Sequence, residues 1–272
     1  MSRISNRFAE LRQQGELGLV AYITAGDPDL RATAEFIPAL EAGGVDVLEL
    51  GVPFSDPLAD GPVIQRASER ALRSGTTLAG ILEMVADARR SSRLPLLLFS
   101  YLNPILRYGF ARFAADAGQA GADGVLITDL SVEEADAYLG EMRRAELDTV
   151  FLAAPTSTDA RLRRICAVSR GFVYAVSRTG VTGPRESLSQ QLLPLLRRIR
   201  AATSLPVAAG FGISRPEHVE ALRGHADAAV VGSALVRVIE EHRSAERLAE
   251  LARALKQGHV EQASLPVHPP KP

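Results

Sequence analysis

Two acidic residues carry the chemistry that this sequence indicates most clearly. Glu49 lies between Leu48 and Leu50 in an apolar run, and Asp60 follows in the long loop 52–62. Burial among apolar neighbours disfavours the charged form of a carboxylate and raises its pKa, which suits the group to proton transfer near neutral pH. Each residue also has a simpler explanation, since backbone donors could satisfy Glu49 and a turn before Gly61 favours aspartate.

Three glycine clusters indicate a second chemical feature, a site for an anion. They occupy residues 179–183, 209–214 and 231–234, and include Gly183, Gly212 and Gly232, with Ser233 directly after the last. Glycines let the backbone approach an anion closely, and N–H groups at the start of a helix point at it with a favourable dipole. One cluster alone is explained equally well by a tight turn. Three clusters after successive predicted strands favour a phosphate site.

The composition excludes several other kinds of function. With 31 basic and 32 acidic residues the net charge is −1, so no broad positive field exists for nucleic acid or an anionic membrane. All five histidines follow residue 209, away from the predicted strand ends, which argues against a histidine base or a metal site. Cys166 is the only cysteine and is expected to be structural. The start has no signal peptide and no stretch approaches the roughly 20 apolar residues of a membrane span, so a cytoplasmic protein is expected.

These residues require strands and helices that bring them together. Short apolar segments that recur along the chain predict eight strands. Predicted strands occupy residues 19–24, 45–51, 94–101, 124–129, 149–153, 172–177, 205–209 and 228–231, with helical patterns between them. This alternation favours a (β/α)8 TIM barrel over a doubly wound open sheet. An extra N-terminal helix, with Ile4, Phe8 and Leu11 on one face, is expected to cover the bottom of the barrel. We expect a single domain over residues 1–258 and a disordered tail over residues 259–272.

Local signals refine this prediction at three places. Pro38 lies inside the helical pattern 32–42 and should kink or shorten that helix. Ser214 and Glu217 have the spacing of a capping box before the seventh helix. Asp129 ends the fourth predicted strand and is expected to have a structural role, whereas the glycine-containing segment 178–190 suits a lid over the site.

At these residues the chain resembles the α subunit family of tryptophan synthase, over about residues 8–255. The most specific match is the segment 48–65, Leu-Glu-Leu-Gly-Val-Pro-Phe-Ser-Asp-Pro-Leu-Ala-Asp-Gly-Pro-Val-Ile-Gln, which reads almost as the family signature does. Shorter matches are 22–28, 100–104, 177–183 and 210–214. One departure is Ser131, where the family usually has proline, and it concerns the local turn more than catalysis.

The resemblance implies a reversible retro-aldol cleavage of indole-3-glycerol phosphate to indole and glyceraldehyde 3-phosphate. It makes Glu49 the proton-transfer group at indole C3 and at the substrate hydroxyl. It makes Asp60 the acceptor of the indole N–H, which stabilises the positive charge on the protonated ring. The implied phosphate ligands are the backbone N–H groups of Gly183, Gly212, Gly232 and Ser233, and the implied indole pocket consists of Tyr22, Tyr101, Tyr174 and Phe211.

The resemblance also implies a partner. The family works as an α2β2 tetramer with a pyridoxal-phosphate β subunit that joins the indole to serine, so this chain itself should carry no cofactor and no metal. The loop 53–60, through Asp56, and the lid, through Arg178 and Thr182, would carry the signal between subunits.

Three other functions compete with this interpretation. A phosphosugar isomerase could use the same barrel and phosphate site, but the complete 49–65 signature argues against it. A catalytically idle, phosphate-binding regulatory barrel would not need both Glu49 and Asp60. A free-standing lyase that releases indole without a partner fits the sequence as well as the complex-dependent enzyme does.

Overall fold

Parallel strands form a closed ring in the computed structural model, which describes residues 2–176, 191–210 and 212–258. The strands are β1 (Gly18–Thr24), β2 (Val47–Gly51), β3 (Leu96–Ser100), β4 (Gly124–Ile127), β5 (Asp148–Val150), β6 (Leu152–Ala153), β7 (Val173–Val176), β8 (Val207–Gly210) and β9 (Ala228–Val231). Because β1 pairs in parallel with both β2 and β9, the first and last strands of the chain meet.

The predicted eight-stranded barrel is confirmed, with one difference in the fifth strand. That strand, predicted at 149–153, is divided into β5 and β6 by Phe151. The sheet order begins with β5 and ends with β6, so the ring closes through this one residue.

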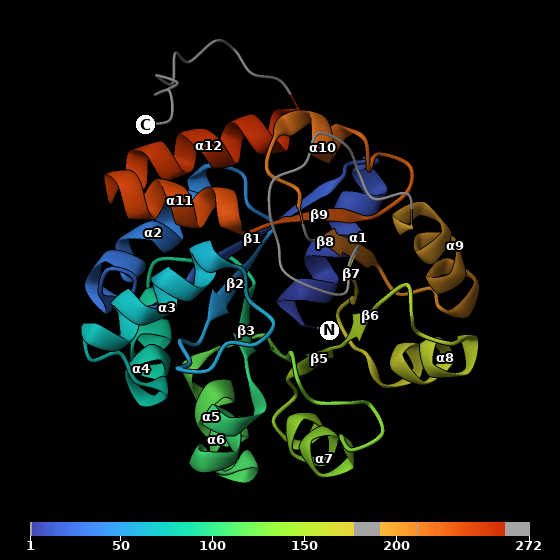
Figure 1. Cartoon of the computed structure of the whole chain (residues 1–272), viewed down its shortest axis with the longest axis horizontal. Helices are drawn as coiled ribbons and strands as arrows, with labels where there is room; N and C mark the ends of the chain where they lie inside the picture. The colour runs from blue at the N-terminus through green and yellow to red at the C-terminus, as the bar shows by residue number, and fades with distance from the viewer. Residues whose placement is uncertain (1, 177–190, 211, 259–272) are drawn as a thin grey trace.

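Helices surround the strands in Figure 1, and α1 is seen inside their ring. The helices are α1 (Arg3–Gln14), α2 (Leu30–Ala42), α3 (Pro62–Arg73), α4 (Leu78–Ala88), α5 (Leu102–Tyr108), α6 (Phe110–Ala120), α7 (Asp136–Arg144), α8 (Asp159–Val168), α9 (Leu192–Ala202), α10 (Pro216–Glu220), α11 (Ser233–His242) and α12 (Ala245–Gln257). The three apolar residues predicted to cover the barrel from α1, namely Ile4, Phe8 and Leu11, are buried with the inward residues of the strands, and the rings of Phe8 and Phe172 are 5.5 Å apart.

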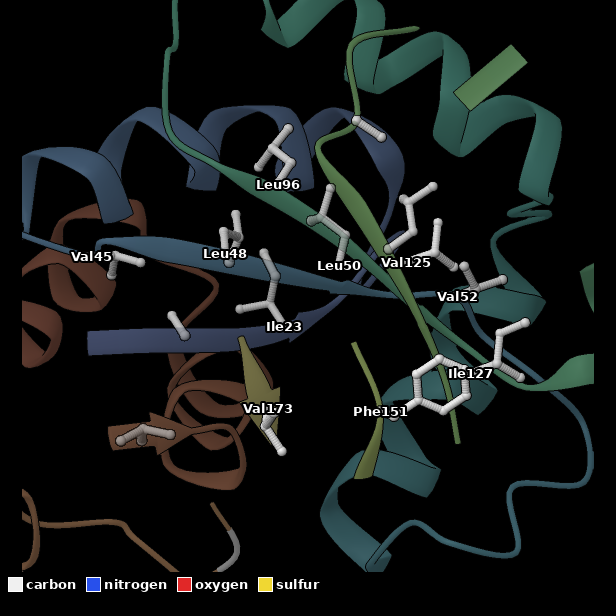
Figure 2. Packing of buried hydrophobic residues seen from close by; sticks show 14 of the residues in the cluster. Ile23, Val45, Leu48, Leu50, Val52, Leu96, Val125, Ile127, Phe151 and Val173 are labelled. Carbon is white, nitrogen blue, oxygen red and sulfur yellow. The ribbon is translucent and has the colours of Figure 1, made fainter. Parts of the chain in front are cut away.

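The alternation of side chains along β2 determines the face of the strand on which the Glu49 side chain lies. Leu48 and Leu50 belong to the core between strands and helices, and Figure 2 shows them beside Leu96 of β3. Val47 belongs to the separate cluster inside the barrel. Because successive side chains of a strand point to opposite faces, Glu49 points into the barrel as Val47 does.

Aspartates at the amino ends of three strands hold the register at the bottom of the barrel. Asp46, before β2, accepts the backbone N–H of Leu19 at 2.6 Å. Asp123, before β4, and Asp227, before β9, accept the N–H groups of Leu96 and Val207 at 2.8 and 2.6 Å. This end lies opposite the carboxyl ends of the strands, where an active site is expected, so these carboxylates serve stability.

Two local predictions differ from the structure. The helix α2 is not shortened at Pro38 and continues to Ala42, because the burial of Phe36, Ile37 and Leu40 outweighs the lost hydrogen bond, whereas the predicted kink stays a prediction. The predicted capping box of α10 does not form.

The helix α10 begins after Arg215, with Pro216 in its first turn and no side-chain cap. The backbone N–H of Ser214 donates instead to His218 Nδ1 at 3.4 Å, so Ser214 belongs to the loop before the cap.

Some predictions concern residues beyond this description. The predicted lid at 178–190 and the predicted tail at 259–272 lie outside the described residues, and the single-domain boundary at 258 stays a prediction. Within the described part of the chain, no helix has both the length and the apolar character needed to cross a membrane.

Candidate active site

A cavity opens at the carboxyl ends of the barrel strands and gathers residues that are far apart in the sequence. Seven of the predicted site residues line it, namely Tyr22, Glu49, Asp60, Tyr174, Gly212, Gly232 and Ser233. The other lining residues were not among the predicted site residues; they are Val63, Ile64, Phe99, Ile213, Ser214, Val230, Ala234 and Arg237. The cavity therefore combines two carboxyl groups, an apolar wall and a glycine-rich rim.

Glu49 is the most unusual group in the cavity. Its side chain is fully buried, and neither carboxyl oxygen has a hydrogen-bond partner among the described residues. Desolvation by burial raises its pKa to about 8. The group is therefore protonated at neutral pH in the ligand-free protein, and it can donate a proton to a ligand in the cavity.

Asp60 comes from the loop before α3 and is held by its neighbours. Gln65 Nε2 donates to the backbone oxygen of Asp60 at 2.8 Å. The Tyr101 hydroxyl accepts the N–H of Ala59 at 2.9 Å and forms a hydrogen bond with the Asp60 carboxylate. Burial raises the pKa of Asp60 to about 6, and the hydrogen bond from Tyr101 opposes that rise. Asp60 is thus mostly ionised at neutral pH, where Glu49 is protonated.

Tyr101 contacts this loop, and Asp129 contacts the helix that follows Tyr101. Asp129 Oδ1 accepts the backbone N–H of Leu102, the first residue of α5, at 2.7 Å. The structural role predicted for Asp129 thus consists of capping a neighbouring helix. Tyr101 stands at the N-cap of that helix and contacts Ala59 and Asp60, but it is not part of the cavity wall.

Glycines at two strand ends make room for tyrosine hydroxyls. A Cβ atom at Gly51 would lie 2.1 Å from the Tyr22 hydroxyl oxygen, and one at Gly210 would lie 2.5 Å from that of Tyr174. Burial raises the pKa of both phenols well above the usual value, so both are neutral. The ring of Tyr22 meets that of Phe99 edge-on at 5.2 Å. Together these rings give the cavity an apolar wall suited to an aromatic ligand.

The glycine-rich rim has the features of an anion site. Gly212 has a φ of +86°, which favours glycine, and a Cβ atom there would meet nothing within 4 Å. Gly232 is the N-cap of α11 and provides no side-chain cap, so the first N–H groups of α11, beginning at Ser233, are available to a ligand.

A buried histidine supports the β8–α10 side of this rim. His218 accepts the N–H of Ser214 through Nδ1 and lies 3.2 Å from Arg215 Nη2 through Nε2. It does not line the cavity.

The remaining predicted residues lie elsewhere. Asp56 is on the exposed part of the 53–60 loop, where it accepts the Ser55 hydroxyl at 2.5 Å. Arg178, Thr182, Gly183 and Phe211 lie outside the described residues. In the described part of the chain, no group of three or more His, Cys, Asp or Glu side chains is arranged to hold a metal ion.

The cavity residues that were not predicted from the sequence had different signals. Val63 and Ile64 lie inside the matched segment 48–65, in the first turn of α3, so the match could have indicated them, and Phe99 is the inward residue before the end of β3. Arg237 lies one helical turn after Ser233, a spacing that marks a shared helix face only once α11 is located.

The fold and the cavity define a class, a (β/α)8-barrel enzyme that applies carboxyl acid–base chemistry to a small anionic ligand. Comparison with known proteins narrows this class. The sequence model of the family described as "Tryptophan synthase alpha chain" matches residues 8–264. The tryptophan synthase alpha chain of Solibacter usitatus is 55% identical over 262 residues, which cover 95% of this chain and 98% of the relative. The chain belongs to the tryptophan synthase alpha chain family.

Solved structures agree with this assignment. A structure of Mycobacterium tuberculosis tryptophan synthase superposes with a TM-score of 0.89 at 38% identity, covering 94% of this chain and 98% of that one. The tryptophan synthase complex of Pyrococcus furiosus gives a TM-score of 0.81 at 41% identity, covering 88% and 97%. The similarity therefore extends over nearly the whole barrel.

Proposed function

We propose that this chain is the α component of tryptophan synthase, which cleaves indole-3-glycerol phosphate reversibly to indole and glyceraldehyde 3-phosphate. The observation that carries the proposal is the fully buried carboxyl group of Glu49, which has no partner among the described residues and whose pKa is raised to about 8. It lies in one cavity with Asp60 and the rim of Gly212, Gly232 and Ser233. A neutral acid, a carboxylate and an anion site are the three groups that the cleavage requires.

Glu49 supplies both proton transfers in this mechanism. Its protonated carboxyl group donates to C3 of the indole ring, which leaves Glu49 ionised and the ring positively charged. The carboxylate then removes the proton of the side-chain hydroxyl, and the bond between C3 and the side-chain carbon breaks as the carbonyl forms. The bonding electrons neutralise the ring, and Glu49 is again protonated for the next turnover.

Asp60 stabilises the charge that appears between these steps. An ionised carboxylate that accepts the indole N–H favours the positively charged ring over the neutral one. Glu49 and Asp60 can divide these roles because desolvation by burial keeps Glu49 protonated, whereas the Tyr101 hydrogen bond favours the charged form of Asp60.

The binding assignments follow the same geometry. Tyr22 and Tyr174 contact the indole ring and Tyr101 positions Asp60, while the N–H groups of Gly212, Gly232 and Ser233 bind the phosphate. The assignments of Gly183 to the phosphate, of Phe211 to the indole and of Arg178 and Thr182 to a lid stay predictions.

The partner in this proposal is a tryptophan synthase β subunit in an α2β2 tetramer. Pyridoxal phosphate belongs to that subunit, and this chain carries no cofactor of its own. Asp56 on the 53–60 loop is the proposed contact, and its exposure leaves it accessible to a partner. The cytoplasmic location stays a prediction.

Indole release from indole-3-glycerol phosphate tests the proposal, measured on the purified chain with and without a β subunit. We expect slow release that rises sharply when the partner is added. Fast release by the chain alone would indicate a free-standing lyase, and no release in either case would favour an idle regulatory barrel.

The variant Glu49→Gln tests the role of the carboxyl group in the same assay. It should nearly abolish turnover while the substrate still binds, because Gln cannot transfer the protons. The exposed Glu83 on α4 offers a matched control, Glu83→Gln, which should keep full activity. Survival of most activity in Glu49→Gln would remove Glu49 from the mechanism.

A further inference from the structure

Arg237 is the only basic side chain among the described residues that line the cavity. It belongs to α11, four positions after Ser233, the first residue of that helix. Residues at this spacing share a face, and helical side chains lean toward the amino end of their helix. The guanidinium group can therefore reach back along α11 toward the N–H groups of Gly232 and Ser233.

The acidic residues near Arg237 leave it available to a ligand. Glu240 lies one turn further along α11, but its carboxylate accepts both arms of Arg66 at 2.8 Å and Arg70 Nη1 at 2.9 Å. Arg70 also forms a two-armed pair with the buried Asp27 at 2.8 Å. These contacts join α3 to α11 on the side of Glu240, and within the described residues Arg237 forms no ion pair.

A phosphate bound in this cavity would need a positive charge that Arg237 can supply. A phosphate ester carries nearly two negative charges at pH 7, whereas the amino end of a helix offers only about half a positive charge. Among the described residues that line the cavity, the other charged group at neutral pH is Asp60, which is negative. Without Arg237, these residues would offer a dianion beside a carboxylate only backbone dipoles to balance it.

We propose that Arg237 is a specificity-determining residue that binds the substrate phosphate over the amino end of α11. Its guanidinium fork matches two phosphate oxygens, and it favours phosphorylated over unphosphorylated indole ligands. This inference rests on the proposed function, since it assigns the phosphate of that substrate to this rim.

Binding of two ligands that differ only in the phosphate tests the proposal. The probes are indole-3-propanol phosphate and indole-3-propanol, added to the purified full chain. Because the chain contains no tryptophan, the fluorescence of the indole ligand can be followed without protein indole background. We expect Arg237→Gln to weaken binding of the phosphorylated ligand about tenfold or more, leave the unphosphorylated ligand unchanged, and raise KM with kcat retained.

Two further variants make the result specific. Arg237→Lys keeps the charge and should retain most of the preference for the phosphorylated ligand. The exposed Arg253 on α12, which does not line the cavity, provides the control Arg253→Gln, and this variant should bind both ligands as the unchanged chain does.

Two other outcomes would separate the role of Arg237 from that of the phosphate rim. Equal weakening of both ligands by Arg237→Gln, or no weakening, would overturn the role of Arg237 while the phosphate rim stands. An unchanged chain that binds both ligands equally would overturn the phosphate rim itself, and with it this inference.

Discussion

Replacing Glu49 by glutamine should change how the stability of the ligand-free chain depends on pH. Burial raises the pKa of Glu49 from 4.5 to about 8 in the folded protein, whereas in the unfolded chain the group titrates near 4.5. Between these values the folded state holds a proton that the unfolded state has lost. Stability therefore falls as pH rises through this window, by about 1.4 kcal/mol per pH unit.

The expected effect is large enough to measure. Between pH 5 and pH 8 the ionisation of Glu49 should cost the folded state about 3 to 4 kcal/mol, which corresponds to roughly 10 °C in Tm for a chain of this size. Glutamine has no such titration. The Tm of Glu49→Gln minus that of the unchanged chain should therefore increase from pH 5 to pH 8 and level off above pH 8.

Thermal unfolding followed by circular dichroism at each pH unit from 5 to 9 measures this difference, and the subtraction removes the titrations that both proteins share. The exposed control Glu83→Gln should give a difference that does not vary with pH. A constant difference for Glu49→Gln as well would mean that Glu49 titrates near its ordinary value, and the reasoning from its burial would be refuted.

Three other substitutions test separate parts of the structure. Asp60→Asn should lower kcat in the indole-release assay by about a hundredfold, because the ring loses its counter-charge, and an unchanged kcat would contradict that role. Gly210→Ala should raise KM, since its Cβ would displace the Tyr174 hydroxyl, whereas Gly140→Ala, with nothing within 4 Å, serves as the control. Asp123→Asn should destabilise the chain by about 3 kcal/mol in urea unfolding, because it leaves the largely buried guanidinium of Arg89 without its charge partner, and a loss below about 1 kcal/mol would contradict this.

The sequence located the catalytic candidates because their signals are local. Glu49 between two leucines, the composition of the 52–62 loop and the glycines around 212 and 232 are each legible within a few residues. The barrel was predictable for a related reason, since alternation of apolar strands and helical patterns repeats along the chain. Even the burial of α1 followed from the spacing of Ile4, Phe8 and Leu11.

Predictions from local sequence propensity failed where contacts with distant parts of the chain outweigh that propensity. Pro38 remains inside α2 because three apolar residues of that helix are buried, and the cap expected from Ser214 gives way to its bond with His218. The interruption of the fifth strand at Phe151 depends on where β5 and β6 find their separate partners. Propensity describes one segment, whereas these outcomes depend on several segments packed together.

The sequence by itself determined which residue types could do the chemistry and the order of the elements that present them. Only the tertiary structure decided the protonation state and the contacts of these residues. Glu49 has no partner among the described residues, Asp129 caps a neighbouring helix, and Arg237 lines the cavity while Glu240 pairs with Arg66 and Arg70. The physical reason is that pKa and charge balance depend on the surroundings of a group in space, and those surroundings come from strands and helices that are remote along the chain.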